Sequence, residues 1–271
     1  MSNQEELVVL GTGNATVKNC YNTCFALRNS EHVFLVDTGG GNGILRQLDR
    51  AGIALTQLHD IFITHKHTDH LLGAVWLIRM IAQSRQKGDY QGVCRIYAHR
   101  ELTELIATLA NLLLQPDQTA ALGNFILLVP VEDGEEREIA GYSVRFFDIH
   151  STKAKQFGFS LILHSGEKLT CLGDEPYNEA NAADVRGSGW LLSEAFCLYE
   201  EAARFKPYEK HHSTVREACL LARELKVPHL VLWHTEETHL AQRKALYSAE
   251  GRQFYNGDLY VPDDLDVISL D

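Results

Sequence analysis

The sequence has 271 residues, enough to bury a sizeable hydrophobic core, and its 45% apolar content is typical of a globular protein. Its 36 acidic and 25 basic residues leave a net charge of −11, which argues against a protein that coats nucleic acid, since such proteins are usually basic. The apolar runs are short, and Arg79 interrupts the run at 75–81, so the sequence predicts no membrane-spanning helix.

Two further features bear on the compartment. The segment Met1–Glu6 is polar and acidic, unlike an export signal. The six cysteines form no C-x-x-C pair, which favours buried, reduced thiols over disulfides. We therefore expect a cytoplasmic protein. The sequence leaves a homodimer open.

The first half of the chain alternates short apolar runs with helical segments. The first run is followed by the turn G-T-G-N, and the second and third can pair as a hairpin. Gly52 ends the first helix. The predicted strands are 7–10, 24–27, 33–36, 61–64, 95–98 and 125–129, and the predicted helices lie near 44–51, 71–87 and 101–114.

The second half repeats this plan after an acidic, turn-rich join at 131–138. Strands are predicted at 142–149, 157–163, 169–172, 190–193 and 229–233, and helices at 214–225 and near 240–249. Several strand-like runs end at a polar residue, as is typical of an α/β enzyme. We interpret residues 1–271 as a single domain built from two similar halves.

The segment H-K-H-T-D-H at 65–70 carries the strongest chemical signal. It lies between a buried strand and a helix. Side chains two apart on an extended chain point the same way, so His65 and His67 can hold one ion together. Asp69 and His70 lie where the chain turns into the helix and can face a second ion. Imidazole and carboxylate are ligands that zinc prefers where thiolate is absent.

This segment resembles the H-x-H-x-D-H signature of the metallo-β-lactamase superfamily. The resemblance implies an α/β fold, a four-layer αββα sandwich, with a site for two metal ions. It extends to nearly the whole chain. The D-T-G sequence at 37–39 resembles the superfamily's D-x-G element, whose aspartate supports the site without touching metal. Asp37 is therefore expected to be a supporting residue.

The superfamily pattern requires three more ligands, and three residues that follow strand-like runs match it in order: His150, Asp174 and His234. By resemblance, His150 joins His65 and His67 at the first ion. His234 joins Asp69 and His70 at the second, and Asp174 bridges the two ions.

The charge balance suits an anionic substrate. Two divalent ions bring four positive charges, while Asp69 and Asp174 bring two negative charges and the histidines bind neutral. Ions in such sites lie roughly 3.5–4 Å apart, and a bound water ionises near pH ~7, which implies a metal-bound hydroxide as nucleophile. Zinc is the expected metal, with manganese and iron as alternatives.

Two shorter elements point to the ribonuclease Z branch. S-E-A-F at 193–196 resembles that family's H-E-A-T-F element, although Ser193 replaces the histidine, and H-S-T at 212–214 resembles its H-S-T element. By resemblance, His212 contacts the scissile phosphate and Glu194 orients it, so that His212 can donate a proton. We therefore expect Asp69, His212 and Glu194 to be the catalytic residues. His67 stands where the oxygen-reducing branch has a glutamate, which favours hydrolysis.

One departure bears on the substrate. Ribonuclease Z holds tRNA with a long arm inserted between its third and fourth ligand motifs, whereas only twenty-three residues separate His150 from Asp174 here. We expect a phosphodiesterase of the ribonuclease Z type acting on a small or flexible phosphodiester, not on folded tRNA. Lys153 and Lys155 could touch a phosphate, although solvated lysines are the simpler interpretation.

Three alternatives stay open: a tRNA 3′-end endonuclease, a hydrolase of esters, lactones or thioesters on the same metals, and a catalytically silent binding protein. The histidines that match no motif are treated as structural, namely His32, His59, His99, His164, His229 and His239.

Overall fold

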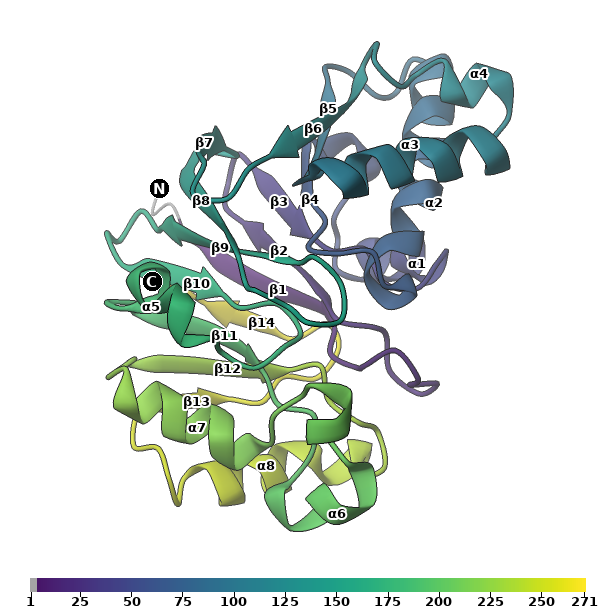
Figure 1. The fold of residues 1–271 in the computed structure, drawn as a ribbon. Helices are drawn as coiled ribbons and strands as arrows, with labels where there is room; N and C mark the ends of the chain where they lie inside the picture. Colours follow the sequence, from purple (N-terminus) through teal and green to yellow (C-terminus); the bar gives the residue numbers. More distant parts are fainter. Residues whose placement is uncertain (1–3) are drawn as a thin grey trace.

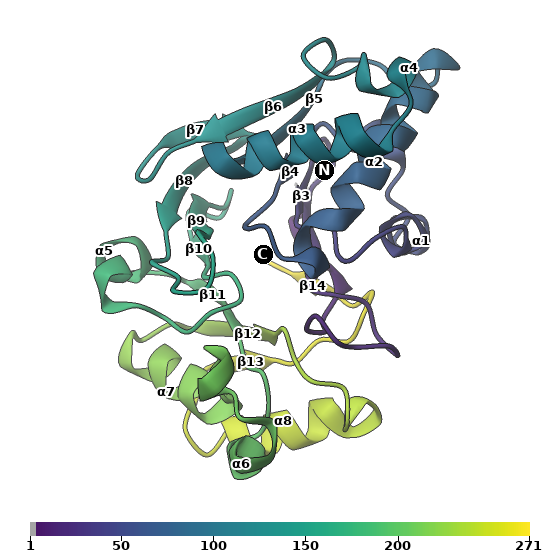
Figure 2. The same cartoon turned by 45° about the vertical axis from the view of Figure 1, so that its right-hand side comes forward.

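Two seven-stranded sheets lie face to face in the computed structural model, which describes residues 4–271 (Figure 1). The first three residues of the acidic N-terminal segment therefore lie outside the described part. Helices α1–α4 gather on one side of the paired sheets, and α6–α8 gather on the other (Figures 1 and 2). This is the four-layer αββα sandwich that the sequence predicted.

The first sheet has the strand order β14-β1-β2-β3-β4-β5-β6. Its strands are antiparallel from β14 to β3 and parallel from β3 to β6. Their bounds are β1 (Glu6–Gly11), β2 (Cys24–Arg28), β3 (Val33–Val36), β4 (Asp60–Phe62), β5 (Cys94–His99), β6 (Ile126–Val131) and β14 (Val267–Ser269). The helices of this half are α1 (Gly43–Arg50), α2 (Thr68–Gln86), α3 (Arg100–Leu113) and α4 (Pro116–Thr119).

The second sheet repeats this arrangement in the order β7-β8-β9-β10-β11-β12-β13. It is antiparallel from β7 to β10 and parallel from β10 to β13. The strands are β7 (Glu136–Ile139), β8 (Tyr142–Asp148), β9 (Phe157–Ile162), β10 (Lys168–Cys171), β11 (Trp190–Glu194), β12 (His229–Trp233) and β13 (Asp258–Tyr260). The helices are α5 (Ala182–Val185), α6 (Ala202–Phe205), α7 (Val215–Glu224) and α8 (Arg243–Gly251).

Three apolar layers hold the sandwich together. One lies between the first sheet and helices α1–α3, and another between the second sheet and helices α5, α7 and α8. The layer between the sheets is rich in aromatic rings: Phe62 lies 4.9 Å from Phe146, and Phe25 lies 4.6 Å from Trp233, centroid to centroid. Each such buried side chain contributes roughly 1.5–3 kcal/mol of transfer free energy, so the shared layer ties the two halves together.

Most predicted elements are confirmed, and three strands were missed. β7 (Glu136–Ile139) begins inside the segment 131–138, where a connection was expected, and the chain passes between the sheets at 132–135. β13 and β14 have three residues each, too short to show a two-residue period. β14 lies beside β1 because a segment from the C-terminus joins the first sheet.

Parallel strands place the functional residues at one edge of the sandwich. Asp37 follows β3, and the 65–70 segment follows β4. In the second sheet, Asp174 follows β10, Glu194 ends β11 and His234 follows β12. The carboxyl ends of parallel strands share an edge, which is the usual ligand position in open α/β sheets.

A buried arginine joins three distant segments beside this edge. Arg243 on α8 is 1% exposed. Its guanidinium donates to Thr12 Oγ1 (2.9 Å), Thr235 Oγ1 (2.8 Å) and the Pro262 carbonyl (2.7 Å). It therefore connects the first loop, the end of β12 and the C-terminal segment.

We expect Arg243→Met to lower the free energy of unfolding by about 2–4 kcal/mol, because it leaves buried acceptors without a donor. Urea denaturation measures this. Lys244→Met is the matched control, since the neighbouring Lys244 is half exposed and pairs with Asp263 and Asp266 near the surface, and we expect it to change stability by under about 1 kcal/mol. Equal losses in both variants would contradict the role given to Arg243.

Candidate metal centre

The junction of β4 and α2 presents four potential ligands. β4 ends at Phe62, and α2 begins at Thr68 with His67 as its N-cap residue. His65 is buried at the end of the strand's extension, and Asp69 and His70 are buried in the first helical turn. The expected arrangement is thus found: His65 and His67 project from extended chain, and Asp69 and His70 project from the helix.

Asp37 holds this junction in place. Its backbone has a φ of 56°. Its carboxylate accepts hydrogen bonds from the Thr64 amide (2.8 Å) and the Thr64 hydroxyl (2.8 Å), and it lies 2.7 Å from His70 Nδ1. A carboxylate at one imidazole nitrogen fixes the tautomer and directs the other nitrogen to a metal. Asp37 therefore leaves His70 Nε2 facing the candidate centre.

We expect Asp37→Ala to weaken metal binding about 10- to 100-fold, because His70 loses the carboxylate that orients it. Competition with a metal chelator measures the change. Asp60→Ala is the matched control: Asp60 begins β4 and accepts from Tyr97 Oη (3.0 Å) at the opposite end of that strand. Equal chelator sensitivity of the two variants would contradict this role for Asp37.

The first ligand group consists of His65, His67 and Asp174. His65 Nε2 lies 2.8 Å from His67 Nδ1 and 3.5 Å from Asp174 Oδ2. All three potential ligand atoms lie within 4.8 Å of one another. Their spacing suits a shared cation.

The second group consists of Asp69, His70 and His234. Asp69 Oδ2 lies 3.3 Å from His70 Nε2 and 3.5 Å from His234 Nε2. Asp174 Oδ2 is also near this group, 3.8 Å from His70 Nε2 and 3.6 Å from His234 Nε2. One carboxylate of the second sheet therefore lies between two clusters, which is the position expected of a bridging ligand.

Several ligand atoms are buried without a hydrogen-bond partner. They include His70 Nε2, Asp174 Oδ1 and both ring nitrogens of His234. An unsatisfied buried polar atom costs roughly 1–3 kcal/mol, so the unsatisfied atoms of three neighbouring residues, with His234 Nε2 as the nitrogen that faces Asp69 and Asp174, indicate that a bound group belongs there. Imidazole nitrogen and carboxylate oxygen fit divalent zinc, manganese or iron.

The site keeps its carboxyl groups ionised. Burial by itself would raise the pKa of Asp174, but His65, His234 and His70 outweigh burial and hold that pKa well below its usual range. His70 and His234 likewise lower the pKa of Asp69 against the effect of burial. Burial also lowers the pKa of His65. For His70, burial is outweighed by Asp37 and Asp69, which raise the pKa of the ring well above its usual range. Metal binding requires anionic carboxylates and neutral imidazoles, so an ion must displace a proton from His70.

His150 lies apart from both clusters. It follows β8 with a φ of 60°, its amide donates to Asp148 Oδ1 (2.8 Å), and its side chain is exposed. It lines a neighbouring depression of about 460 Å³ together with Tyr208 and His211, and this depression shares His212 with the cavity over the clusters. The two clusters found among residues 4–271 do not include it, so its role as a ligand of the first ion stays a prediction.

His212 and Glu194 lie together beside the clusters. The His212 ring is 5.0 Å from the His234 ring and stacks on Phe196 at 5.0 Å and 4°. Glu194 is fully buried; its Oε1 accepts from the Ser213 amide (2.5 Å), and its Oε2 lies 3.6 Å from His212 Nδ1. His211 is exposed and contacts Thr152 Oγ1 (3.0 Å).

A cavity of about 610 Å³ opens over these residues. It contains ligands from both clusters together with His212, and three lysines also line it: Lys66, Lys153 and Lys210. The ring of Phe196 forms part of the wall, with Lys210 Nζ 4.9 Å from its centroid. The cavity therefore combines metal ligands, positive charge and an aromatic surface.

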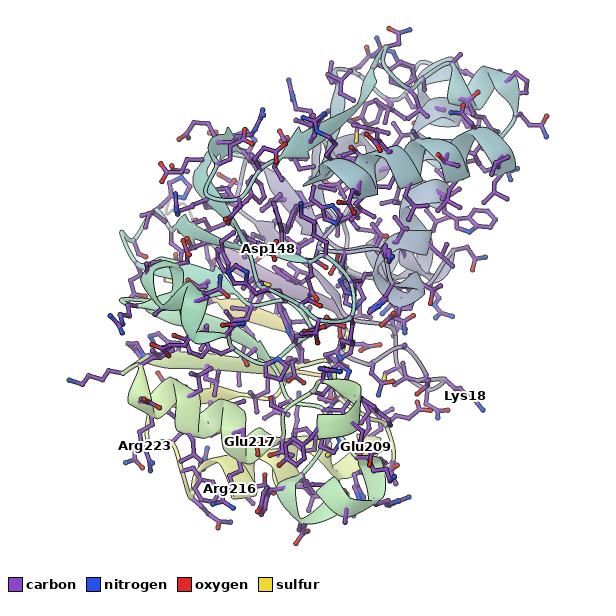
Figure 3. All side chains as sticks on the ribbon, in the orientation of Figure 1. Lys18, Asp148, Glu209, Arg216, Glu217 and Arg223 are labelled. Atoms are coloured by element: carbon purple, nitrogen blue, oxygen red, sulfur yellow. The ribbon has the colours of Figure 1, made fainter. Side chains whose placement is uncertain are left out.

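The first loop also lines the cavity. Asn14 and Thr16 line the cavity, while Lys18, further along the loop, points away from the body of the molecule (Figure 3). Asn14 Nδ2 donates to the Thr235 carbonyl (3.1 Å), which joins the loop to the residue after His234. Of the residues that line the cavity, the sequence had singled out the turn, Lys153, and the predicted ligands and catalytic residues. Lys66 and Phe196 lie inside the 65–70 and 193–196 segments but were given no role, and Lys210 was given none either.

Known proteins with a similar sequence or structure support the class of protein that the fold and the site indicate. Ribonuclease Z from Thermococcus onnurineus is 24% identical over 314 residues, covering 98% of this chain and 94% of that protein. The metallo-β-lactamase fold protein YhfI from Bacillus subtilis superposes with a TM-score of 0.79 at 15% identity, covering 98% of this chain and 100% of that one. The human short-form tRNase Z superposes with a TM-score of 0.74 at 21% identity, covering 98% and 99%.

The protein is thus a metal-dependent hydrolase of the metallo-β-lactamase superfamily and is ribonuclease Z-like, as the sequence predicted. The family described as "Anti-Pycsar protein Apyc1" matches residues 5–253, and the chain belongs to this family. No helix among residues 4–271 has the length and apolar character needed to cross a membrane.

Proposed function

We propose that this protein is a two-metal phosphodiesterase that cleaves a small or flexible phosphodiester. One observation carries the proposal: a single cavity brings together two clusters of metal-binding residues, three lysines and His212. The negative charge of a phosphodiester must be neutralised before a nucleophile can approach, and the lysines supply the positive charge that does this.

The metal ligands are assigned to two ions. His65, His67 and Asp174 would hold the first ion, and Asp69, His70 and His234 would hold the second. His150 would be a further ligand of the first ion, and Asp174 would serve both ions. We propose zinc at both positions, with manganese or iron as alternatives. When bound, such ions supply Lewis acidity and a hydroxide nucleophile at neutral pH.

The protein's own side chains position the substrate and move the proton. Lys66, Lys153 and Lys210 bind the anionic oxygens of the phosphodiester. Glu194 faces Nδ1 of His212, which leaves the other ring nitrogen for the leaving oxygen. Phe196 stacks on the same imidazole and restricts its rotation. His212 therefore donates a proton as the leaving oxygen develops negative charge.

The test is an activity panel on metal-loaded protein. We expect turnover of bis-p-nitrophenyl phosphate and of dinucleotides, complete loss on chelation, and recovery when zinc or manganese is restored. A lactone and a thioester of similar size serve as comparison substrates. Faster turnover of the lactone or thioester than of every phosphodiester would overturn the proposal in favour of an ester hydrolase.

We expect weak or no cleavage of precursor tRNA. The segment between His150 and Asp174 is occupied by β9, β10 and short connections. The chain also has a net charge of −11, and phosphate contacts dominate affinity for folded nucleic acid. A gel assay with a 3′-extended precursor tRNA at physiological salt measures this, with a short single-stranded oligonucleotide as control. Efficient, site-specific removal of the 3′ trailer would show that the protein is a tRNA-processing endonuclease.

A further inference from the structure

A second, smaller cavity lies at the end of β5. His99 ends that strand and is the N-cap residue of α3. The residue is 3% exposed, and within residues 4–271 neither ring nitrogen makes a hydrogen bond of normal length and angle, although the backbone of Lys155 lies near enough to raise the pKa of the ring. The ring lines a cavity of about 40 Å³, more than the roughly 10–15 Å³ that one water requires. A buried imidazole whose nitrogens lack hydrogen bonds lowers the stability of the fold, so a polar ligand in this cavity would be stabilising.

The surroundings of this cavity favour an anion. Lys66 and Lys155 line it, and Lys155 Nζ lies 5.5 Å from the centroid of the Phe157 ring. The N-terminus of α3, a helix of 14 residues, also faces this point through His99, and helix N-termini attract negative charge. Glu101 contributes the one carboxylate of the lining. The lysines therefore outnumber the acidic group two to one.

His99 suits an acceptor-rich ligand. Burial, followed by Lys155, lowers the pKa of His99, so the ring is neutral at physiological pH and keeps one N–H donor. Phosphate oxygens accept such a donor and pair with the two ammonium groups at the same time.

The small cavity adjoins the metal centre. Lys66 lines both cavities, and it lies between His65 and His67 in the chain. Lys153 faces the large cavity while Lys155, two residues further on, faces the small one. An anion beside His99 would therefore share Lys66 with a phosphodiester held over the metal ligands.

We propose that the His99 cavity binds a phosphate group other than the one that is cleaved. Its occupant is either a second phosphate of the substrate, which rests on the proposed phosphodiesterase function, or free inorganic phosphate. The substrate class it favours is a phosphodiester that carries an additional phosphate.

Binding is tested with inorganic phosphate and does not require activity. The imidazole proton signals of His99 are assigned by their loss in His99→Leu. We expect them to shift when phosphate is added to the metal-loaded protein. Lys155→Ala should raise the dissociation constant for phosphate, measured from this shift, about tenfold, since it removes a charged hydrogen-bond donor.

Two further variants test whether the charge of the lining controls phosphate binding. Glu101→Gln should strengthen phosphate binding roughly threefold, because it removes the one negative charge of the lining. Lys87→Ala changes an exposed lysine at the end of α2 and should leave binding unchanged. A purely structural His99 would give no phosphate-dependent shift and the same signals in all these variants, which would overturn the proposal.

A kinetic arm distinguishes the two sources of phosphate. In the wild type, a dinucleotide with a 5′-phosphate should have a KM about tenfold below that of the same dinucleotide without it, and Lys155→Ala should abolish the difference. Equal KM values with a clear phosphate-dependent shift would assign the cavity to free phosphate. Cleavage of both dinucleotides without any phosphate-dependent shift would refute phosphate binding in the His99 cavity but not the phosphodiesterase activity. A phosphate-dependent shift without cleavage of either dinucleotide would refute only the phosphodiesterase activity.

Discussion

His65→Ala should lower kcat/KM by at least about 10³-fold for every phosphodiester tested. His65 is fully buried, and its Nε2 lies within 3.5 Å of potential ligand atoms of both His67 and Asp174. Removing it breaks the first ligand group. Metal ions contribute several kcal/mol to the stabilisation of such transition states, and each 1.36 kcal/mol is worth tenfold in rate.

Steady-state kinetics with bis-p-nitrophenyl phosphate and with a dinucleotide measure this loss. His32→Ala is the control, because His32 is exposed at the β2–β3 turn and should leave kcat/KM unchanged. Near wild-type activity in a folded His65→Ala variant would show that the first ligand group is not part of the catalytic site.

The second large effect depends on the leaving group. His212→Ala should slow cleavage of a nucleotide diester by ~10²–10⁴-fold, the usual contribution of a general acid. The leaving alkoxide of a nucleotide is a poor leaving group and needs a proton. By contrast, p-nitrophenolate departs without one, so turnover of bis-p-nitrophenyl phosphate should fall by less than about tenfold.

Glu194→Gln should resemble His212→Ala but with a smaller loss. The amide keeps an oxygen for the Ser213 amide and loses the charge that faces His212 Nδ1. Comparison of the two substrates in both variants separates proton donation from binding. An equal loss on the two substrates in His212→Ala would identify His212 as a phosphate-binding or structural residue.

The αββα fold and the ligand set were expected from the resemblance to the superfamily, and the segment that carries this resemblance is local. The 65–70 segment joins a buried strand to a helix, and it can be interpreted without knowing the rest of the chain. Asp174 and His234 each follow a strand of the second sheet, so the ends of parallel strands brought them to the same edge. A supporting role for Asp37 was likewise expected, whereas its hydrogen bond with Thr64 was not.

What the sequence could not predict depends on long-range packing and loop conformation. Lys66, Lys153 and Lys210 come from three separate segments and meet only around the cavity. His99 matched no motif and was treated as structural, yet its ring lines a second cavity with neither nitrogen in a hydrogen bond of normal geometry among residues 4–271. The placement of His150 follows from a left-handed backbone conformation at the end of β8, which residue order does not specify.

Metal content, measured before and after removal of Asp174, tests the central claim most directly. Asp174 Oδ2 lies 3.5–3.8 Å from ring nitrogens in both clusters, so losing it should weaken both ions. Elemental analysis of protein purified without chelators should give about two divalent ions per chain and a clear reduction in Asp174→Ala. A single ion per chain, retained unchanged in Asp174→Ala, would contradict the account.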